Sequence, residues 1–232
     1  MSSGKKNKNA RRAAGAQPLP ASRQPAGPSR GPWWRQRLWL LLGGGAVVVA
    51  AVIVVAVVAS GGSSKPTKVA FDQMANLQTS APPWNNDIGD LATHLSDVDL
   101  TGMSSEALAF HIHSHLNLYV NGKKVAVPAG VGIGQTFITE VHTHTPDGVI
   151  HVESPVDKNY VLGQFFGEWG VKLTRSCVGR YCGKLRWWVD GTRGGGVLDP
   201  ADIILRPHEE IAIAYGTPPK KIPASYKFPA GE

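Results

Sequence analysis

One uninterrupted apolar run constrains this chain of 232 residues more than any other feature. Leu38 to Ala59 reads LWLLLGGGAVVVAAVIVVAVVA, which is 22 residues without a charged or strongly polar side chain. As an α-helix the run extends about 33 Å, enough to cross a hydrocarbon core of roughly 30 Å. Because a helix satisfies its own backbone hydrogen bonds in lipid, the run predicts an amino-terminal transmembrane helix.

The 37 residues before this run indicate its orientation. They contain nine Lys and Arg residues and no Asp or Glu. Since cationic flanks stay in the cytoplasm, we expect a single-pass cell-membrane protein with its amino terminus inside and an extracytoplasmic carboxyl-terminal domain, with the lipid bilayer as a partner. A cleaved signal peptide is the alternative, because Val57 and Ala59 precede Ser60. The length of the run favours the anchor, since a signal h-region has about 7 to 15 residues.

The positive net charge comes from the tail. Removing its nine cations from the 24 Lys and Arg residues leaves 15 against 17 Asp and Glu, so the exported part is close to neutral. The overall positive charge is therefore no sign of nucleic-acid binding by the folded domain. We therefore expect no nucleic-acid partner, whereas an extracytoplasmic protein partner remains open.

Composition divides the chain into five predicted segments. They are a disordered basic cytoplasmic tail (1–37), the transmembrane helix (38–59), a linker (60–83), an extracytoplasmic domain (84–219) and a carboxyl-terminal tail (220–232). The third segment begins with Gly and Ser residues typical of flexible linkers. The fourth segment has the length of one domain with one core.

Alternating polar and apolar residues predict a fold of class α+β, mostly antiparallel β-sheet with one short helix. Asn121-Gly122 is a strong hairpin signal between two such runs. The predicted strands are Phe110 to Val120, Lys123 to Val127, Phe137 to His144, Val149 to Ser154, Val171 to Leu173, Leu185 to Val189 and Ile211 to Tyr215. The helix is expected within Tyr160 to Trp169, where Val161, Phe165 and Trp169 are spaced by four.

Cys177 and Cys182 are the two cysteines of the chain. Outside the cytoplasm thiols oxidise, so this Cys-x4-Cys spacing predicts a structural disulfide that closes a small loop. A metal-thiolate site is the alternative, for which two cysteines alone are incomplete.

Six of the eight histidines lie within 41 residues. Residues two apart in a strand share a face, so His111, His113 and His115 line one side of the first strand. His142 and His144 in one strand, and His151 and Glu153 in the next, are aligned by the same rule. A four-residue loop would set His142 opposite His151, whereas a two-residue loop would set His144 opposite His151. Both registers gather these three histidines on one face.

Neutral imidazole is the commonest protein ligand for zinc and copper. The pattern therefore predicts a transition-metal site, with zinc or copper as the ion. The candidate ligands are His142, His144, His151, Glu153, His111, His113 and His115.

Three functions fit these residues. A membrane-anchored metal-binding module needs only affinity, and the sequence favours it. A metal-free interaction or pH-sensing domain would use the histidines as titrating groups. A metal-dependent enzyme would also need an open coordination position and an acid or base, a role available to Glu140 or Glu153; no motif for a catalytic residue supports it.

Four phrases of the chain resemble an uncharacterised bacterial family of single-pass, membrane-anchored exported domains. They are HIHSHLNLYVNGKKVAVPAGVGIG from His111, HTHTPDGVIHVESP from His142, LGQFFGEWG from Leu162 and PHEEIAIAYG from Pro207. The resemblance covers most of the predicted domain, and the histidine phrases are its most specific part. It implies the membrane topology and the domain limits, and it transfers no catalytic residue.

Overall fold

The computed structural model of the protein describes residues 65–86, 89 and 91–232. The predicted cytoplasmic tail and transmembrane segment lie outside these residues. Among the helices that are described, none has the length and apolar character needed to cross a bilayer.

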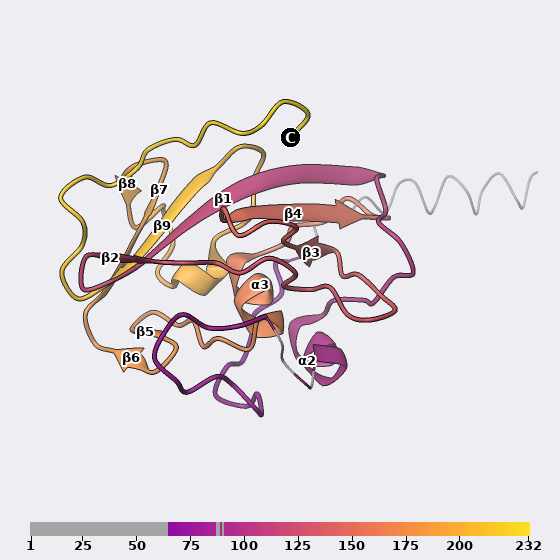
Figure 1. Ribbon diagram of the computed structural model, residues 1–232, viewed down its shortest axis with the longest axis horizontal. Helices are drawn as coiled ribbons and strands as arrows, with labels where there is room; N and C mark the ends of the chain where they lie inside the picture. The colour runs from indigo at the N-terminus through magenta and orange to yellow at the C-terminus, as the bar shows by residue number, and fades with distance from the viewer. Residues whose placement is uncertain (1–64, 87–88, 90) are drawn as a thin grey trace, which may run out of the picture. The chain divides into compact units, whose positions relative to one another are not determined.

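A sheet of seven strands forms the centre of the described chain, in the order β3-β4-β1-β9-β7-β8 with β2 also paired to β1. The elements are α2 (Leu91–Val98), β1 (Phe110–Val120), β2 (Lys123–Val125), β3 (Val141–His142), β4 (Val149–Ser154), α3 (Leu162–Glu168), β5 (Cys177–Val178), β6 (Tyr181–Cys182), β7 (Leu185–Val189), β8 (Thr192–Arg193), the 3-10 turn η1 (Pro200–Asp202) and β9 (Glu210–Tyr215). Figure 1 shows β1 and β4 side by side above α3.

Strand β1 organises the sheet because its 11 residues are long enough to hold different partners along its length. Its first half pairs antiparallel with β4, and its second half pairs parallel with β9 and antiparallel with β2. Ile112, Leu116 and Leu118 are buried in the core. The alternate residues of β1 therefore form the other face, where the histidines lie.

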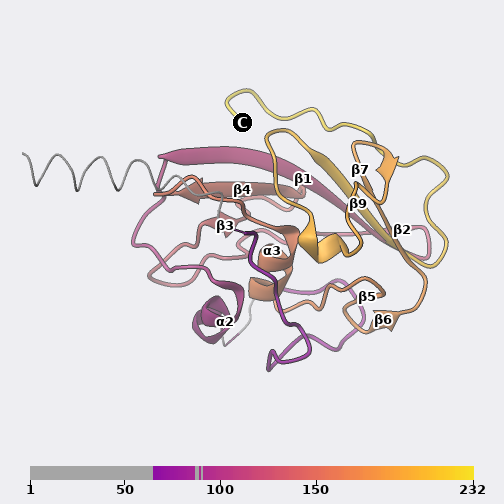
Figure 2. The same cartoon turned by 180° about the vertical axis from the view of Figure 1, so that it is seen from behind.

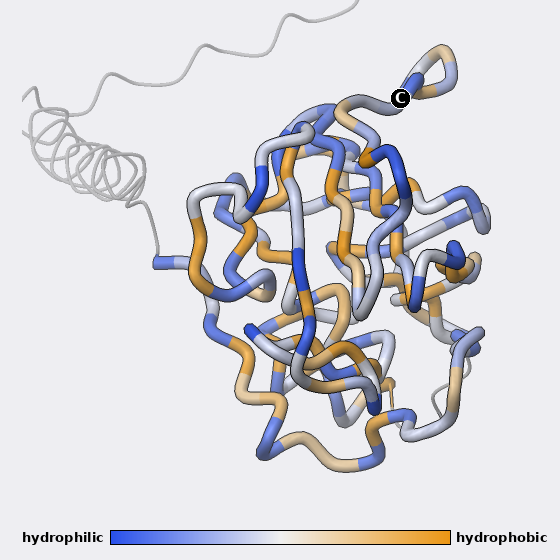
Figure 3. Tube along the Cα trace, turned by 90° about the vertical axis from the view of Figure 1, so that its left-hand side faces the viewer, coloured by the Kyte–Doolittle hydropathy of each residue, from blue (hydrophilic) through white to orange (hydrophobic). Residues whose placement is uncertain are grey.

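Different parts of the chain cover the two faces of the sheet. In Figures 1 and 2 the helices α2 and α3 lie on one side, and the carboxyl-terminal segment crosses the other. The helical side is the apolar core, in which Phe165, Phe166 and Trp169 are completely buried. Phe71 and Met74, from the segment expected to be a linker, are buried in the same core. Hydrophobic and hydrophilic residues alternate along much of the trace in Figure 3, as strands with unlike faces require.

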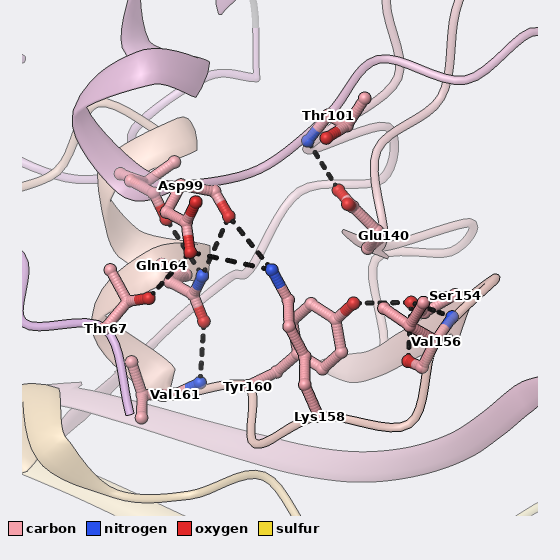
Figure 4. Close-up of polar contacts among 11 residues, drawn as sticks. Thr67, Asp99, Thr101, Glu140, Ser154, Val156, Lys158, Tyr160, Val161 and Gln164 are labelled. Carbon is pink, nitrogen blue, oxygen red and sulfur yellow. Dashed lines mark hydrogen bonds and ion pairs between the residues drawn. The ribbon is translucent and has the colours of Figure 1, made fainter. Parts of the chain in front are cut away.

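Polar side chains join the two helices and fix the segments beside them (Figure 4). Gln164 Nε2 donates to Val98 O at 2.8 Å, and Gln164 Oε1 accepts from Val161 N at 3.0 Å. The first bond joins α3 to the end of α2, and the second caps the first turn of α3. Thr101 N donates to Glu140 Oε2 at 2.7 Å, which fixes the residue just before β3.

The expected fold class is wrong: the described chain is mostly β with two α-helices, and one strand pair is parallel. The helix within Tyr160 to Trp169 is confirmed as α3, but α2 was not foreseen. It has only eight residues, of which His94, Leu95 and Val98 are buried. Such a short helix is held by packing rather than by its own propensity.

The parallel pairing of β1 with β9 joins segments about 95 residues apart, such as His115 with Glu210. No local pattern reports such a contact. The predicted strand Val171 to Leu173 is also wrong, since Leu173 makes only an isolated bridge to Val178. The predicted strand Phe137 to His144 contracts to Val141–His142.

The disulfide between Cys177 and Cys182 is confirmed. Their Cα atoms lie 4.1 Å apart, and the two residues are paired in the small β5–β6 ribbon. The bridge closes the loop between the two strands, as the short spacing predicted.

Candidate metal centre

Three neighbouring strands bring the histidines together. On β4, His151 lies opposite His113 of β1 and also opposite His142 of β3. The pairing of His142 with His151 is the register of a four-residue loop. Glu153, two residues further along β4, lies opposite His111. Since directly opposed Cβ atoms lie about 4.5 to 5.5 Å apart, the middle strand places its two polar residues within reach of both neighbours.

Two overlapping quartets of ligand atoms result. The first quartet is His111, His113, His151 and Glu153, and the second quartet is His142, His144, His151 and Glu153. Within each quartet, one ligand atom from every residue lies within 4.8 Å of the others. The structure thus brings together six of the seven predicted ligands.

The short distances within the quartets suit a bound ion. The Nε2 atoms of His111 and His113 lie 3.1 Å apart, and so do those of His142 and His144. Neighbouring ligands of a tetrahedral zinc ion, with bonds of about 2.0 to 2.1 Å, are separated by roughly 3.4 Å. Each pair is hydrogen bonded in the metal-free chain, at a distance close to that between two ligands of one ion.

Glu153 lies between the two pairs. Its Oε1 is 3.3 Å from His111 Nε2 and 3.5 Å from His151 Nδ1. Its Oε2 is 3.9 Å from His142 Nε2. The carboxylate thus presents one oxygen to each quartet.

Burial favours the neutral, metal-binding form of the central histidines. Removal from water, followed by the charges of neighbouring histidines, lowers the pKa of His113 to about 4, of His142 to about 4 and of His151 to about 3. At neutral pH these imidazoles keep a free lone pair. Burial, followed by the charge of Glu106, raises the pKa of Glu153 above its ordinary value, so a nearby cation would favour its ionised form.

A backbone hydrogen bond fixes the orientation of the His142 ring. Its Nδ1 lies 2.9 Å from Thr139 O, and because a carbonyl only accepts, Nδ1 carries the hydrogen. The lone pair is then on Nε2, which faces His144. A hydrogen bond of this kind usually orients metal-binding histidines.

Thr139 is itself held by α3. Its hydroxyl oxygen lies 2.8 Å from Val141 O and 2.7 Å from Glu168 Oε2. A hydroxyl has one hydrogen, so both contacts are hydrogen bonds only when the Glu168 carboxyl is protonated. Complete burial raises the pKa of Glu168 well above its ordinary value, which supports that state. The helix thereby positions the carbonyl that orients His142.

Several buried polar atoms of the centre lack a hydrogen-bond partner among the described residues. His151 Nδ1, Glu153 Oε2 and Glu232 Oε2 are buried and have no hydrogen-bond partner among the described residues. Leaving such an atom unsatisfied costs about 1 to 3 kcal/mol. A bound cation would satisfy His151 Nδ1 and Glu153 Oε2, which belong to the quartets.

His115 is the predicted ligand that joins neither quartet. Its Nδ1 lies 2.6 Å from Glu210 Oε2, and its Nε2 lies 3.0 Å from Asp147 O. Its ring stacks on Tyr226 with centroids 3.7 Å apart, and Asn117 Nδ2 donates to the other oxygen of Glu210 at 2.7 Å. Because each ring nitrogen faces a protein oxygen, neither is directed at a metal position.

Two carboxylates near the centre were not foreseen. Glu106 Oε1 lies 3.3 Å from His144 Nε2, and Glu232 Oε1 lies 4.0 Å from His151 Nε2. Both come from segments outside the sheet, and no spacing in the sequence connects them with the histidines. Glu140, considered as an acid or base, belongs to neither quartet, and its carboxylate accepts from Thr101 N.

The remaining two histidines, His94 and His208, also lie outside both quartets. His94 contacts Ala75 O in the core, and the ring of His208 packs on Phe228. The carboxyl-terminal segment contacts the histidine face through Tyr226, Phe228 and Glu232.

Comparison of the chain with family models, with curated proteins and with solved structures returned no match. The resemblance to a family of membrane-anchored exported domains therefore remains a prediction. The geometry of the histidine cluster carries the functional argument.

Proposed function

We propose that this domain is a transition-metal-binding module whose ligands come from the two quartets. The observation that carries the proposal is the convergence of five histidines and Glu153, four of the histidines on three adjacent strands and His144 just after β3, with ligand atoms within 4.8 Å in each quartet. Imidazole with one carboxylate suits zinc or copper, and copper has the higher intrinsic affinity for such donors. The buried atoms of His151 and Glu153 that lack partners support a cation at this place.

An extracytoplasmic location accompanies this function. Its support is the Cys177–Cys182 disulfide, because such bonds persist in oxidising compartments. In that setting the module would bind metal ions outside the cytoplasm.

The metal-free pH sensor is less well supported. A sensor of physiological pH needs histidines that titrate between about pH 5 and 8. Burial moves the pKa of His113, His142 and His151 to about 4 or below. An enzyme would need an open coordination position and a neighbouring acid or base, and no observation on the described residues selects it over simple binding.

Elemental mass spectrometry of the full chain, purified without an affinity tag, tests the proposal. We expect a stoichiometric transition metal in the wild-type protein and its loss in the His142→Ala/His151→Ala double variant. The matched control is His208→Asn, which removes a histidine outside both quartets. Asn tolerates the positive φ of 58° at this position, so the backbone should not be strained.

Circular dichroism of each variant separates loss of the ligands from loss of the fold. Absence of any metal in folded wild-type protein after exposure to zinc, copper, manganese and iron would contradict the proposal. Equal metal content in the wild-type protein and the folded double variant would also contradict it, because the ion would then lie elsewhere.

A further inference from the structure

We infer that the histidine cluster holds two metal ions: one at the His111–His113 pair and one at the His142–His144 pair, with the Glu153 carboxylate between them. The inference rests on the proposed function, since it presupposes that the cluster binds metal. It adds the nuclearity of the site and assigns each histidine pair to its own ion.

The two histidine pairs are near copies of each other. The ring centroids of His111 and His113 are 4.6 Å apart at an interplanar angle of 75°, and those of His142 and His144 are 4.7 Å apart at 76°. In both pairs the Nε2 atoms are separated by 3.1 Å. Two equivalent pairs, each with the spacing of two ligands, indicate two equivalent positions for an ion.

The number of donors exceeds the needs of one ion. Zinc takes about four protein ligands in a structural site, and this cluster offers five imidazoles and a carboxylate. Each quartet has four members, and neither takes in the other's histidine pair. A neutral imidazole offers one lone pair, so His151 would bind one of the two ions, whereas the Glu153 carboxylate has an oxygen for each. The quartets overlap only in His151 and Glu153.

The sheet explains why the pairs stay separate. The shared residues His151 and Glu153 lie on β4, which is the middle strand, whereas His113 and His142 lie on the strands to either side. Adjacent strands are about 4.8 Å apart, so the backbones of β1 and β3 are separated by roughly 10 Å. The shared residues His151 and Glu153 therefore lie between the His111–His113 pair and the His142–His144 pair.

Glu153 has the geometry of a bridging ligand. Its Oε1 faces His111 at 3.3 Å, and its Oε2 faces His142 at 3.9 Å. The second oxygen is buried and has no hydrogen-bond partner among the described residues. In two-metal sites the ions are about 3.5 to 4 Å apart, a separation that one carboxylate spans with its two oxygens.

The surrounding charges suit two divalent ions. Glu106 lies 3.3 Å from His144, and Glu232 lies 4.0 Å from His151. With Glu153, three carboxylates surround the five imidazoles. They would offset most of the positive charge of two ions at a site whose inner ligands His113, His142, His151 and Glu153 are buried, where an unpaired charge is costly.

Titration of the full chain with zinc alone, followed by calorimetry and by elemental mass spectrometry after dialysis, tests the inference. We expect two equivalents of zinc in the wild-type protein and in the His208→Asn control. We expect one equivalent in the His111→Ala/His113→Ala variant and one in the His142→Ala/His144→Ala variant. Glu153→Gln should weaken the second equivalent by at least tenfold relative to the first.

The outcomes separate the inference from the function on which it rests. One equivalent in the folded wild-type protein overturns the two-ion inference and leaves the metal-binding function intact. Complete loss of zinc in both folded pair variants also overturns it, because the pairs would then serve one ion. No zinc in the wild-type protein overturns the proposed function as well. The wild-type stoichiometry decides even if a variant fails to fold.

Discussion

The two halves of β1 use histidine in opposite ways. His113 and His115 are two residues apart on one face of one strand, and both are buried. His113 lies among other imidazoles, 4.5 Å from the ring of His151, whereas His115 has a carboxylate and a carbonyl on its two nitrogens. The neighbours that β4 and β9 supply therefore decide whether a histidine of this strand is a candidate ligand or a structural residue.

Replacement of His115 tests the structural half of this comparison and has the largest expected effect. His115→Ala leaves the buried Glu210 carboxylate without its closest partner. Breaking a buried pair in this way costs about 3 to 5 kcal/mol. We expect the free energy of unfolding in urea to fall by that amount, with metal content per folded molecule unchanged. Loss of metal at unchanged stability would reverse the assignment of His115.

Replacement of His151 tests the metal-binding half. His151 is common to both quartets, so His151→Ala should weaken metal binding by about 100-fold or more, a larger loss than removal of an outer hydrogen bond produces. Competition with a chromophoric zinc chelator measures the change. The control is His208→Asn, for which we expect wild-type affinity; equal affinities in all three proteins would remove His151 from the site.

Low pH should destabilise the metal-free protein because protons bind His113 of β1 and His151 of β4 more weakly in the folded state than in the unfolded state. The pKa of His113 and His151 is lowered to about 4 and about 3 in the folded state, against an ordinary value of 6.5. The unfolded chain therefore binds more protons, and stability falls as the pH drops from about 6.5 towards 4.

A His113→Asn/His151→Asn variant serves as the reference for this effect. Because the carboxylates remain in both proteins, the difference between their curves of melting temperature against pH isolates the histidines. We expect a shallower fall in the variant between pH 6.5 and 4.5. Parallel curves would show that these imidazoles are not kept neutral by the fold.

Replacement of Tyr226 has the smallest expected effect. Its ring stacks on His115 at 3.7 Å, and an aromatic pair contributes about 0.5 to 1.5 kcal/mol beyond its buried area. Tyr226→Ala should lower the melting temperature by a few degrees, as scanning calorimetry would detect. Metal content should be unchanged, since His115 is not a ligand; a drop in metal content would show that the carboxyl-terminal segment holds the centre closed.

Local patterns predicted much of the sheet. The bounds of β1, β4 and β7 follow from alternation between turn residues, and α3 follows from the spacing of Val161, Phe165 and Trp169. These signals are local because a strand or helix repeats its buried side at a fixed interval. The same rule accounts for the His111–His113 pair, since both residues lie on β1. It does not account for the His142–His144 pair, because β3 ends at His142 and His144 lies in the following bend.

Other parts of the centre depended on contacts between distant segments. Nothing in the sequence around His115 distinguishes it from His111 or His113, because Glu210 comes from β9 and Tyr226 from the carboxyl-terminal segment. Glu106 lies beside His144 for a similarly nonlocal reason. Helix α2 is short enough that its packing, rather than its periodicity, supports it.

The amino-acid sequence by itself determined which residues share a face, where the hairpins turn and which two cysteines form the bridge. Each of these depends on backbone periodicity or on a short loop. The tertiary structure alone decided that β1 and β9 run parallel, that β4 lies between two histidine pairs and that His115 is bonded at both ring nitrogens. Those features follow from burial and hydrogen bonding between segments that meet only when the chain is folded.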